Sequence, residues 1–225
     1  MTAGKRDRDI RNKLAVPFRV TPEVLLQLAM TPRWTLTSLS HGKPNIANYA
    51  DLLRAATSYA DVQKTLITPS FTWDDLKRLR DRWKGTLLVK GILHPDDALK
   101  CAKLGCDGIV VSNHGGRQVA FGPPTIEALP AIADAVGGRL KILLDSGIRR
   151  GADVLRAKAL GADFTLAGRA LAFGVGAGGR DGAERAMQIL TLELERALGQ
   201  LGTAAFADVG PDEDITFTNG RFGPA

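Results

Sequence analysis

The chain has 225 residues, of which 44% are hydrophobic and 24% charged, with a formal net charge of +6 and an isoelectric point near 9.5. This composition excludes a mainly disordered chain, because there is ample apolar material to bury. The basic charge permits an anionic ligand or surface without choosing its kind. The chain has two cysteines, too few for a disulfide framework, which favours a reducing cytoplasm. No apolar run reaches the ~18 residues that are needed to span a bilayer.

The first 85 residues form the less regular part of the chain. We expect a short helix beginning at Thr21, an irregular stretch over residues 31–50, and a further helix opened by a capping box at Thr72. No segment here resembles a strand followed by polar side chains. We therefore predict a loop and helical segment over residues 1–85, followed by a second domain over residues 86–225.

After residue 85, short apolar strands alternate with helices. Strands are predicted at residues 87–92, 108–113, 142–147 and 164–169. Helices are predicted at residues 94–105, 125–136, 151–160 and 181–201, with Thr125 as the cap of the second. Continuous apolar strands in alternation with helices are typical of an α/β fold with a parallel sheet.

Polar residues lie at the carboxyl ends of all four strands. They are Lys90, Ser112-Asn113-His114, Asp145-Ser146 and Gly168-Arg169. A (β/α)8 TIM barrel builds its active site at this end of its strands, whereas a doubly wound sheet concentrates such groups at one switch point. A barrel needs eight strands and typically about 250 residues. We therefore predict an incomplete barrel.

The motif Ser112-Asn-His-Gly-Gly-Arg-Gln118 follows a buried strand directly. Its His114 can act as a base near neutral pH, and Arg117 offers a bidentate fork for a carboxylate. The two glycines let the backbone approach a planar ligand. The alternative is that His114 caps a strand and Arg117 is merely solvated.

Two further turns carry arginines beside glycines: residues 145–151 and residues 167–169. They match the phosphate site that barrels place after their last two strands. Two ordinary strand–helix turns with exposed arginines are the alternative. Lys90 either extends to solvent or points into the site, where it would neutralise an anion.

Together these motifs resemble the FMN-dependent 2-hydroxy-acid oxidases and dehydrogenases, nearest the (S)-mandelate and L-lactate dehydrogenase branch. The resemblance is carried by residues 4–9, 32–34, 45–48, 88–91, 112–118 and 145–169. Val119-Ala120 departs from it, since the family usually has Leu-Asp there. By this resemblance the chain corresponds to barrel strands 5 to 8, without the first four strands and the two substrate tyrosines. We therefore expect the chain alone not to be a competent enzyme.

The resemblance implies oxidation of an L-2-hydroxy acid, of the lactate or mandelate type, to the 2-oxo acid. By the resemblance His114 accepts the proton, Arg117 and Arg6 hold the substrate carboxylate, and Lys90 stabilises the reduced flavin. The implied FMN-binding residues are Lys90, Ser112, Asp145, Ser146, Gly147, Ile148, Arg149, Gly168 and Arg169. Two rivals stay open: a truncated, non-catalytic fragment, and an unrelated phosphate-binding barrel such as an isomerase or aldolase.

In the mandelate and lactate dehydrogenase branch, the segment matching residues 14–50 attaches the enzyme to the membrane surface. Here that segment joins a basic start to several apolar side chains, which suits interfacial contact. A loop packed on the barrel or on another subunit is the alternative. We expect a cytoplasmic protein, peripheral on the inner face of the cell membrane, with no nucleic-acid partner, and a homo-oligomer when complete.

Overall fold

The computed structural model describes residues 11, 20–42, 47–51, 70–119 and 121–210. The chain divides into two compact units, residues 1–71 and residues 72–225. Arg6 lies outside the described residues.

The first unit contains α2 (Pro22–Met30), α3 (Pro32–His41) and the 3-10 turn η1 (Ala47–Tyr49). The predicted helix at Thr21 is confirmed, because the Thr21 hydroxyl caps α2 by accepting from Val24 N. The irregular stretch predicted over residues 31–50 is wrong for residues 32–41, which form α3. Pro32 stands in the first turn of α3, where a helix needs no N–H donor, and Gly42 ends that helix with a φ of 71°.

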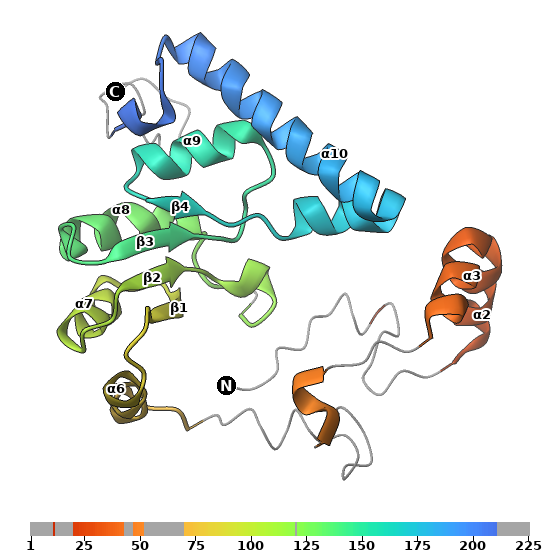
Figure 1. The fold of residues 1–225 in the computed structure, drawn as a ribbon, viewed down its shortest axis with the longest axis horizontal. Helices are drawn as coiled ribbons and strands as arrows, with labels where there is room; N and C mark the ends of the chain where they lie inside the picture. Colours follow the sequence, from red (N-terminus) through yellow and green to blue (C-terminus); the bar gives the residue numbers. More distant parts are fainter. Residues whose placement is uncertain (1–10, 12–19, 43–46, 52–69, 120, 211–225) are drawn as a thin grey trace. The chain divides into compact units, whose positions relative to one another are not determined.

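The second unit is a layer of helices on a parallel sheet. Its helices are α6 (Trp73–Arg82), α7 (Pro95–Lys103), α8 (Thr125–Val136), α9 (Gly151–Ala159) and α10 (Arg169–Leu201), with short turns η2 (His114–Gly116) and η3 (Phe206–Asp208). Its strands are β1 (Leu88–Ile92), β2 (Gly108–Val111), β3 (Lys141–Leu144) and β4 (Phe164–Thr165), parallel and in the order β1-β2-β3-β4 (Figure 1). The four predicted strands and the partial-barrel α/β fold are thereby confirmed, although β4 is shorter than predicted.

One face of the sheet forms the hydrophobic core with the helices. The strand side chains on this face include Ile92, Ile109, Val111, Ile142 and Leu144, and they pack with Cys101, Leu129, Ile132 and Val136. Because successive strand residues point to opposite faces, Leu88, Val110, Leu143 and Phe164 lie on the other face. These four residues do not belong to that core cluster, and Phe164 is 64% exposed.

Two local predictions are wrong in instructive ways. Thr125 does not cap α8: the cap is Pro124, and Thr125 is the first helical residue. The long last helix begins at Arg169 instead of residue 181, and it bends at Gly178 and Gly179, whose backbones are non-helical. The glycine-rich sequence before residue 181 therefore forms helix, and Gly174 allows close packing, since a Cβ there would lie 2.4 Å from the Gly182 carbonyl oxygen.

Candidate active site

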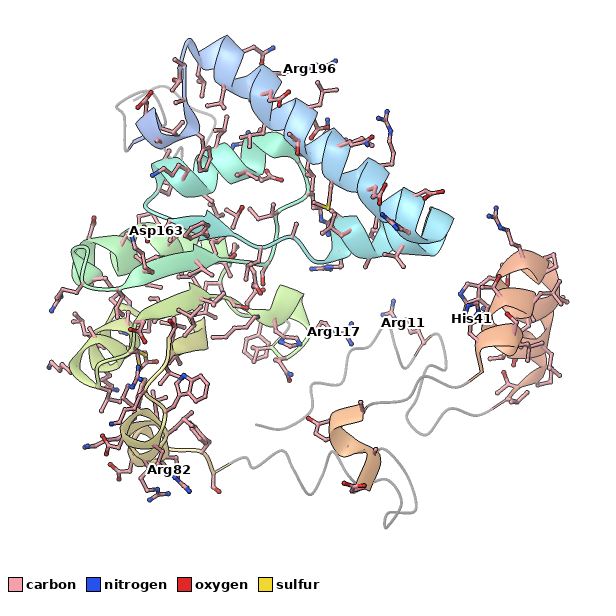
Figure 2. The ribbon with its side chains drawn as sticks, viewed as in Figure 1. Arg11, His41, Arg82, Arg117, Asp163 and Arg196 are labelled. Carbon is pink, nitrogen blue, oxygen red and sulfur yellow. The ribbon has the colours of Figure 1, made fainter. Side chains whose placement is uncertain are left out.

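Three turns meet at the carboxyl edge of the sheet. They are residues 112–118 after β2, residues 145–149 after β3 and residues 166–169 after β4. Figure 2 shows Arg117 beyond the carboxyl end of β2 and Asp163 at the opposite edge, just before β4. Because all four strands are parallel, the side chains that follow them converge at one edge, where barrels place their sites.

Lys90 links the carboxyl ends of β1, β2 and β3 at this edge. Its Nζ donates to Ser112 Oγ at 2.6 Å and lies 2.7 Å from Asp145 Oδ2. Burial raises the pKa of the Asp145 carboxyl, but hydrogen bonds from Lys90, Ser112 and Ser146 and the Lys90 charge outweigh it and hold the pKa below its usual range. The structure thus aims Lys90 into the site as one half of an ion pair.

The turn that carries His114 has a fixed backbone. The His114 amide donates to Ser112 Oγ at 3.1 Å, and the Gly116 amide donates to Asn113 Oδ1 at 3.1 Å. His114 itself has a φ of 56°, in the left-handed region that few side chains adopt. The side chains of His114 and Arg117 are exposed. The backbone is therefore held while both functional side chains remain available to a ligand.

The turn after β3 is anchored from behind by Thr125. The buried Thr125 hydroxyl lies 2.8 Å from each of the carbonyl oxygens of Asp145 and Ser146. Gly147 has a φ of 120°, and a Cβ added there would meet nothing within 4 Å, so a ligand can approach its backbone closely. Ile148 packs into the core, so its side chain faces away from the edge.

Arginines and a helix N-terminus complete the edge. Arg169 Nη2 donates to the Gly115 carbonyl oxygen at 3.0 Å, which links the turns after β4 and β2. Arg169 also begins α10, whose N-cap Gly168 provides no capping side chain and leaves open space. Arg149 is exposed. A guanidinium group at an uncapped helix N-terminus forms a favourable environment for a phosphate.

The structure therefore brings together, through direct contacts, five of the predicted residues and Gly115. The predicted ones are Lys90, Ser112, Asp145, Ser146 and Arg169. Arg6 lies outside the described residues, so its predicted pairing with Arg117 stays a prediction. The anchoring roles of Asn113 and Thr125 were missed. The signal for Thr125 was ambiguous, because a threonine at a helix start is usually read as its cap.

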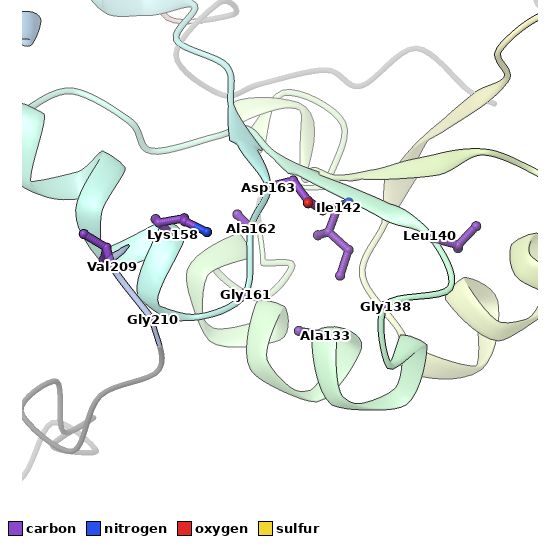
Figure 3. Close-up of a pocket in the computed structure, with 10 residues that line it drawn as sticks. All are labelled: Ala133, Gly138, Leu140, Ile142, Lys158, Gly161, Ala162, Asp163, Val209 and Gly210. Carbon is purple, nitrogen blue, oxygen red and sulfur yellow. Dashed lines mark hydrogen bonds between the residues drawn. The ribbon is translucent and has the colours of Figure 1, made fainter. Parts of the chain in front are cut away.

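A pocket of about 300 Å³ lies away from this edge. Figure 3 shows its lining, which includes Leu140 and Ile142 from the start of β3, together with Lys158, Ala162 and Asp163. The Asp163 carboxylate is already engaged there by Lys141 Nζ and the Ile142 amide, each at 2.8 Å. This pocket is therefore separate from the candidate site.

Fold and geometry together define part of a (β/α)8 barrel, with Lys90 and Arg169 at the carboxyl edge of its sheet. The sequence model that describes the FMN-dependent dehydrogenase family matches residues 1–215 of this chain, and the chain belongs to this family. It is 37% identical over 214 residues to (S)-mandelate dehydrogenase from Pseudomonas putida, covering 93% of this chain and 53% of that protein. It is 41% identical over 215 residues to L-lactate dehydrogenase from Xanthomonas campestris, covering 94% and 55%.

Solved structures agree. The crystal structure of the monotopic membrane protein (S)-mandelate dehydrogenase matches with a TM-score of 0.87 and 36% identity, over 94% of this chain and 56% of that one. A mandelate oxidase variant with a monooxide FMN adduct matches with a TM-score of 0.59 and 40% identity, over 62% of this chain and 44% of that one. The chain spans about half the length of the curated relatives it matches.

Proposed function

We propose that this chain supplies the phosphate-binding, flavin-edge and proton-accepting parts of an FMN-dependent L-2-hydroxy-acid dehydrogenase. The observation that carries the proposal is the set of contacts joining Lys90, Ser112 and Asp145 beside the His114 turn. Membership of the FMN-dependent dehydrogenase family and similarity to lactate and mandelate dehydrogenases support it, and they argue against the isomerase or aldolase reading.

The described residues fit FMN by the chemistry of their donor set. Arg149, Arg169 and the uncapped start of α10 suit the phosphate, and the open backbone at Gly147 and Gly168 gives it room. Lys90 places a positive charge where the electron-rich edge of the flavin would lie, and Ser112 lies beside it. Asp145 and Ser146 suit the ribityl hydroxyls, and Ile148 contributes only its backbone.

Residues of the chain itself then bind the substrate and accept its proton. When bound, FMN supplies the acceptor for the two electrons that a 2-hydroxy acid loses on becoming a 2-oxo acid. His114 takes the proton of the substrate hydroxyl, because its imidazole is exposed on a rigid turn at the site. Arg117, three residues on, holds the carboxylate, which orients the hydroxyl toward His114.

Anaerobic mixing tests this function. Because the chain alone is not expected to be a competent enzyme, the test uses the chain as part of a complete barrel. This protein with bound FMN is mixed with L-lactate or (S)-mandelate, and loss of the oxidised flavin absorbance is followed. We expect reduction by the L-2-hydroxy acid but not by its D enantiomer. Stoichiometric FMN that no 2-hydroxy acid reduces would favour the non-catalytic reading instead.

We also propose that α2 and α3 contact the inner face of the cell membrane. The solved (S)-mandelate dehydrogenase is described as a monotopic membrane protein. Apolar side chains on these two helices are more than half exposed: Leu25, Leu26, Met30, Trp34, Leu36 and Leu39. Among the described residues no helix is long and apolar enough to cross a bilayer. Exposed apolar groups on short helices suit burial at the headgroup level.

Sedimentation with phosphatidylglycerol-containing vesicles tests the membrane contact. Leu26→Glu and Met30→Glu should each weaken vesicle binding by at least about tenfold, because an apolar side chain that entered the interface becomes charged. Met187→Glu, at an exposed position of α10, is the matched control and should bind as the unmodified chain does. Equal sedimentation of all variants would remove the membrane contact.

A further inference from the structure

Ser146 and His114 share an unusual backbone. Among the described residues other than glycine, only these two have a left-handed φ, 70° for Ser146 and 56° for His114. Such conformations cost energy and persist only where the surroundings impose them, most often at functional sites. The two residues lie on turns after different strands, β3 and β2. Both strained residues therefore stand in turns that form the candidate site.

One hydrogen bond joins the two turns directly. The Gly115 amide donates to Ser146 Oγ at 2.9 Å, and the same hydroxyl donates to Asp145 Oδ1 at 2.6 Å. A serine hydroxyl has a single proton to give, so its position is fixed by accepting from one partner and donating to the other. The other oxygen of Asp145 is paired with Lys90. The path of contacts thus runs from Lys90 through Asp145 and Ser146 to Gly115.

Further hydrogen bonds hold three residues of this path. Thr125 fixes the carbonyl oxygens of Asp145 and Ser146, and Arg169 donates to the Gly115 carbonyl oxygen. Gly115 is thus held at its amide by Ser146 and at its carbonyl by Arg169. It directly follows His114, so its position sets the direction of the His114 backbone.

We propose that Ser146 is a positioning residue that couples the phosphate-binding turn, residues 145–149, to the turn that carries His114. The proposal rests on the proposed function, in which the first turn holds FMN and His114 accepts the proton. Ordering of the first turn by the ligand fixes the Ser146 hydroxyl, which fixes the Gly115 amide and with it the His114 backbone. Ser146 acts through His114 and need not touch the reacting atoms.

Three substitutions at Ser146 distinguish this positioning role from a contribution to the stability of the fold alone. Ser146→Gly removes the hydroxyl and relieves the positive φ, so the chain should unfold at the same temperature or a higher one. Ser146→Ala removes the hydroxyl and keeps the strain. Ser146→Thr keeps the hydroxyl but places a β-branched residue at a φ of 70°, so it should lower the unfolding temperature. It should preserve the hydrogen bond from the Gly115 amide to the side chain at position 146, which we call the bridge.

The hydrogen-exchange rate of the Gly115 amide reports on this bridge and does not require catalytic turnover. We expect exchange about tenfold faster in Ser146→Gly and Ser146→Ala than in the unmodified chain, with Ser146→Thr close to the unmodified rate. Saturating FMN should slow Gly115 exchange further in the unmodified chain and much less in Ser146→Gly. Equal Gly115 exchange in the unmodified chain and Ser146→Gly would overturn the bridge, and an equal effect of FMN on both would overturn the coupling.

Kinetics of the FMN-loaded enzyme complete the test. In Ser146→Gly we expect kcat to fall at least about tenfold while KM changes little, with activity restored in part by Ser146→Thr. Unchanged kcat in Ser146→Gly would mean that Ser146 serves stability alone. An unmodified chain that binds no FMN would instead count against the proposed function, and the exchange rates without FMN would still report on the bridge.

Discussion

The Lys90 ammonium on β1 reaches across β2 and lies 2.7 Å from the Asp145 carboxylate that follows β3. On the way it donates to Ser112 at the end of β2. One side chain thus ties together the ends of three neighbouring strands. The pair is only partly shielded, with Lys90 47% and Asp145 17% exposed, so it orients groups more than it stabilises the fold.

The Asp145 pair makes part of the stability depend on pH. Because the pKa of Asp145 is lowered in the folded chain, its contribution is present above the unfolded value of about 3.9 and is lost as pH falls through the lower folded value. Asp145→Asn should cost about 1 kcal/mol or less at pH 7, and this difference should shrink below pH ~4. Urea unfolding at both pH values measures it, with Glu195→Gln on exposed α10 as control. A difference that grows in acid would contradict the assignment.

His114→Gln should separate binding from chemistry. The side chain is exposed and the backbone of its turn is held by Ser112, so the substitution should leave the fold and the FMN Kd nearly unchanged. In the active enzyme, flavin reduction by a 2-hydroxy acid should slow by about 10²–10⁴-fold, the usual contribution of a positioned base. Stopped-flow absorbance measures this rate. His94→Asn, which keeps a capping side chain on α7, should reduce normally. A near-normal rate in His114→Gln would mean that another group takes the proton.

Gly151 sets the approach of two helices. An added Cβ at the start of α9 would lie 2.1 Å from the backbone nitrogen of Leu194 on α10. Gly151→Ala should therefore lower the free energy of unfolding by about 1–3 kcal/mol through overpacking. Gly199→Ala, where a Cβ meets nothing within 4 Å, should raise it by about 0.5–1 kcal/mol by improving helix propensity. Chemical denaturation distinguishes them, and equal effects would mean that the α9–α10 contact is looser than observed.

The elements that the sequence predicted well were those with strong local signals. The apolar runs of β1, β2 and β3 are such signals, and so is the Thr72–Asp75 capping box at the start of α6. The part of α10 before residue 181 was missed because its glycines are unfavourable in isolated helices. They are tolerated because Gly174 and Gly182 let the two halves of α10 touch, a tertiary gain that no local pattern reveals.

The predictable part of the candidate site was likewise the part with a simple signal in the sequence. Lys90, Ser112, Asp145 and Arg169 were predictable because a parallel sheet gathers the residues at the carboxyl ends of its strands at one edge. Their individual partners were not. That Arg169 binds the Gly115 carbonyl, and that Thr125 anchors the Asp145 turn, depends on separations of 54 and 20 residues across the fold.

Comparison of FMN with riboflavin tests most directly whether this edge of the sheet is a flavin phosphate site. The two ligands differ only in the phosphate, and fluorescence titration gives the Kd of each. We expect FMN to bind at least about tenfold more tightly than riboflavin, and Arg169→Ala to remove roughly 1.5–3 kcal/mol of FMN binding while leaving riboflavin unaffected. Arg156→Ala on α9, whose exposed side chain pairs with Asp153, is the control. Equal affinity for FMN and riboflavin, or an Arg169→Ala variant that keeps the full preference for FMN, would contradict the assignment.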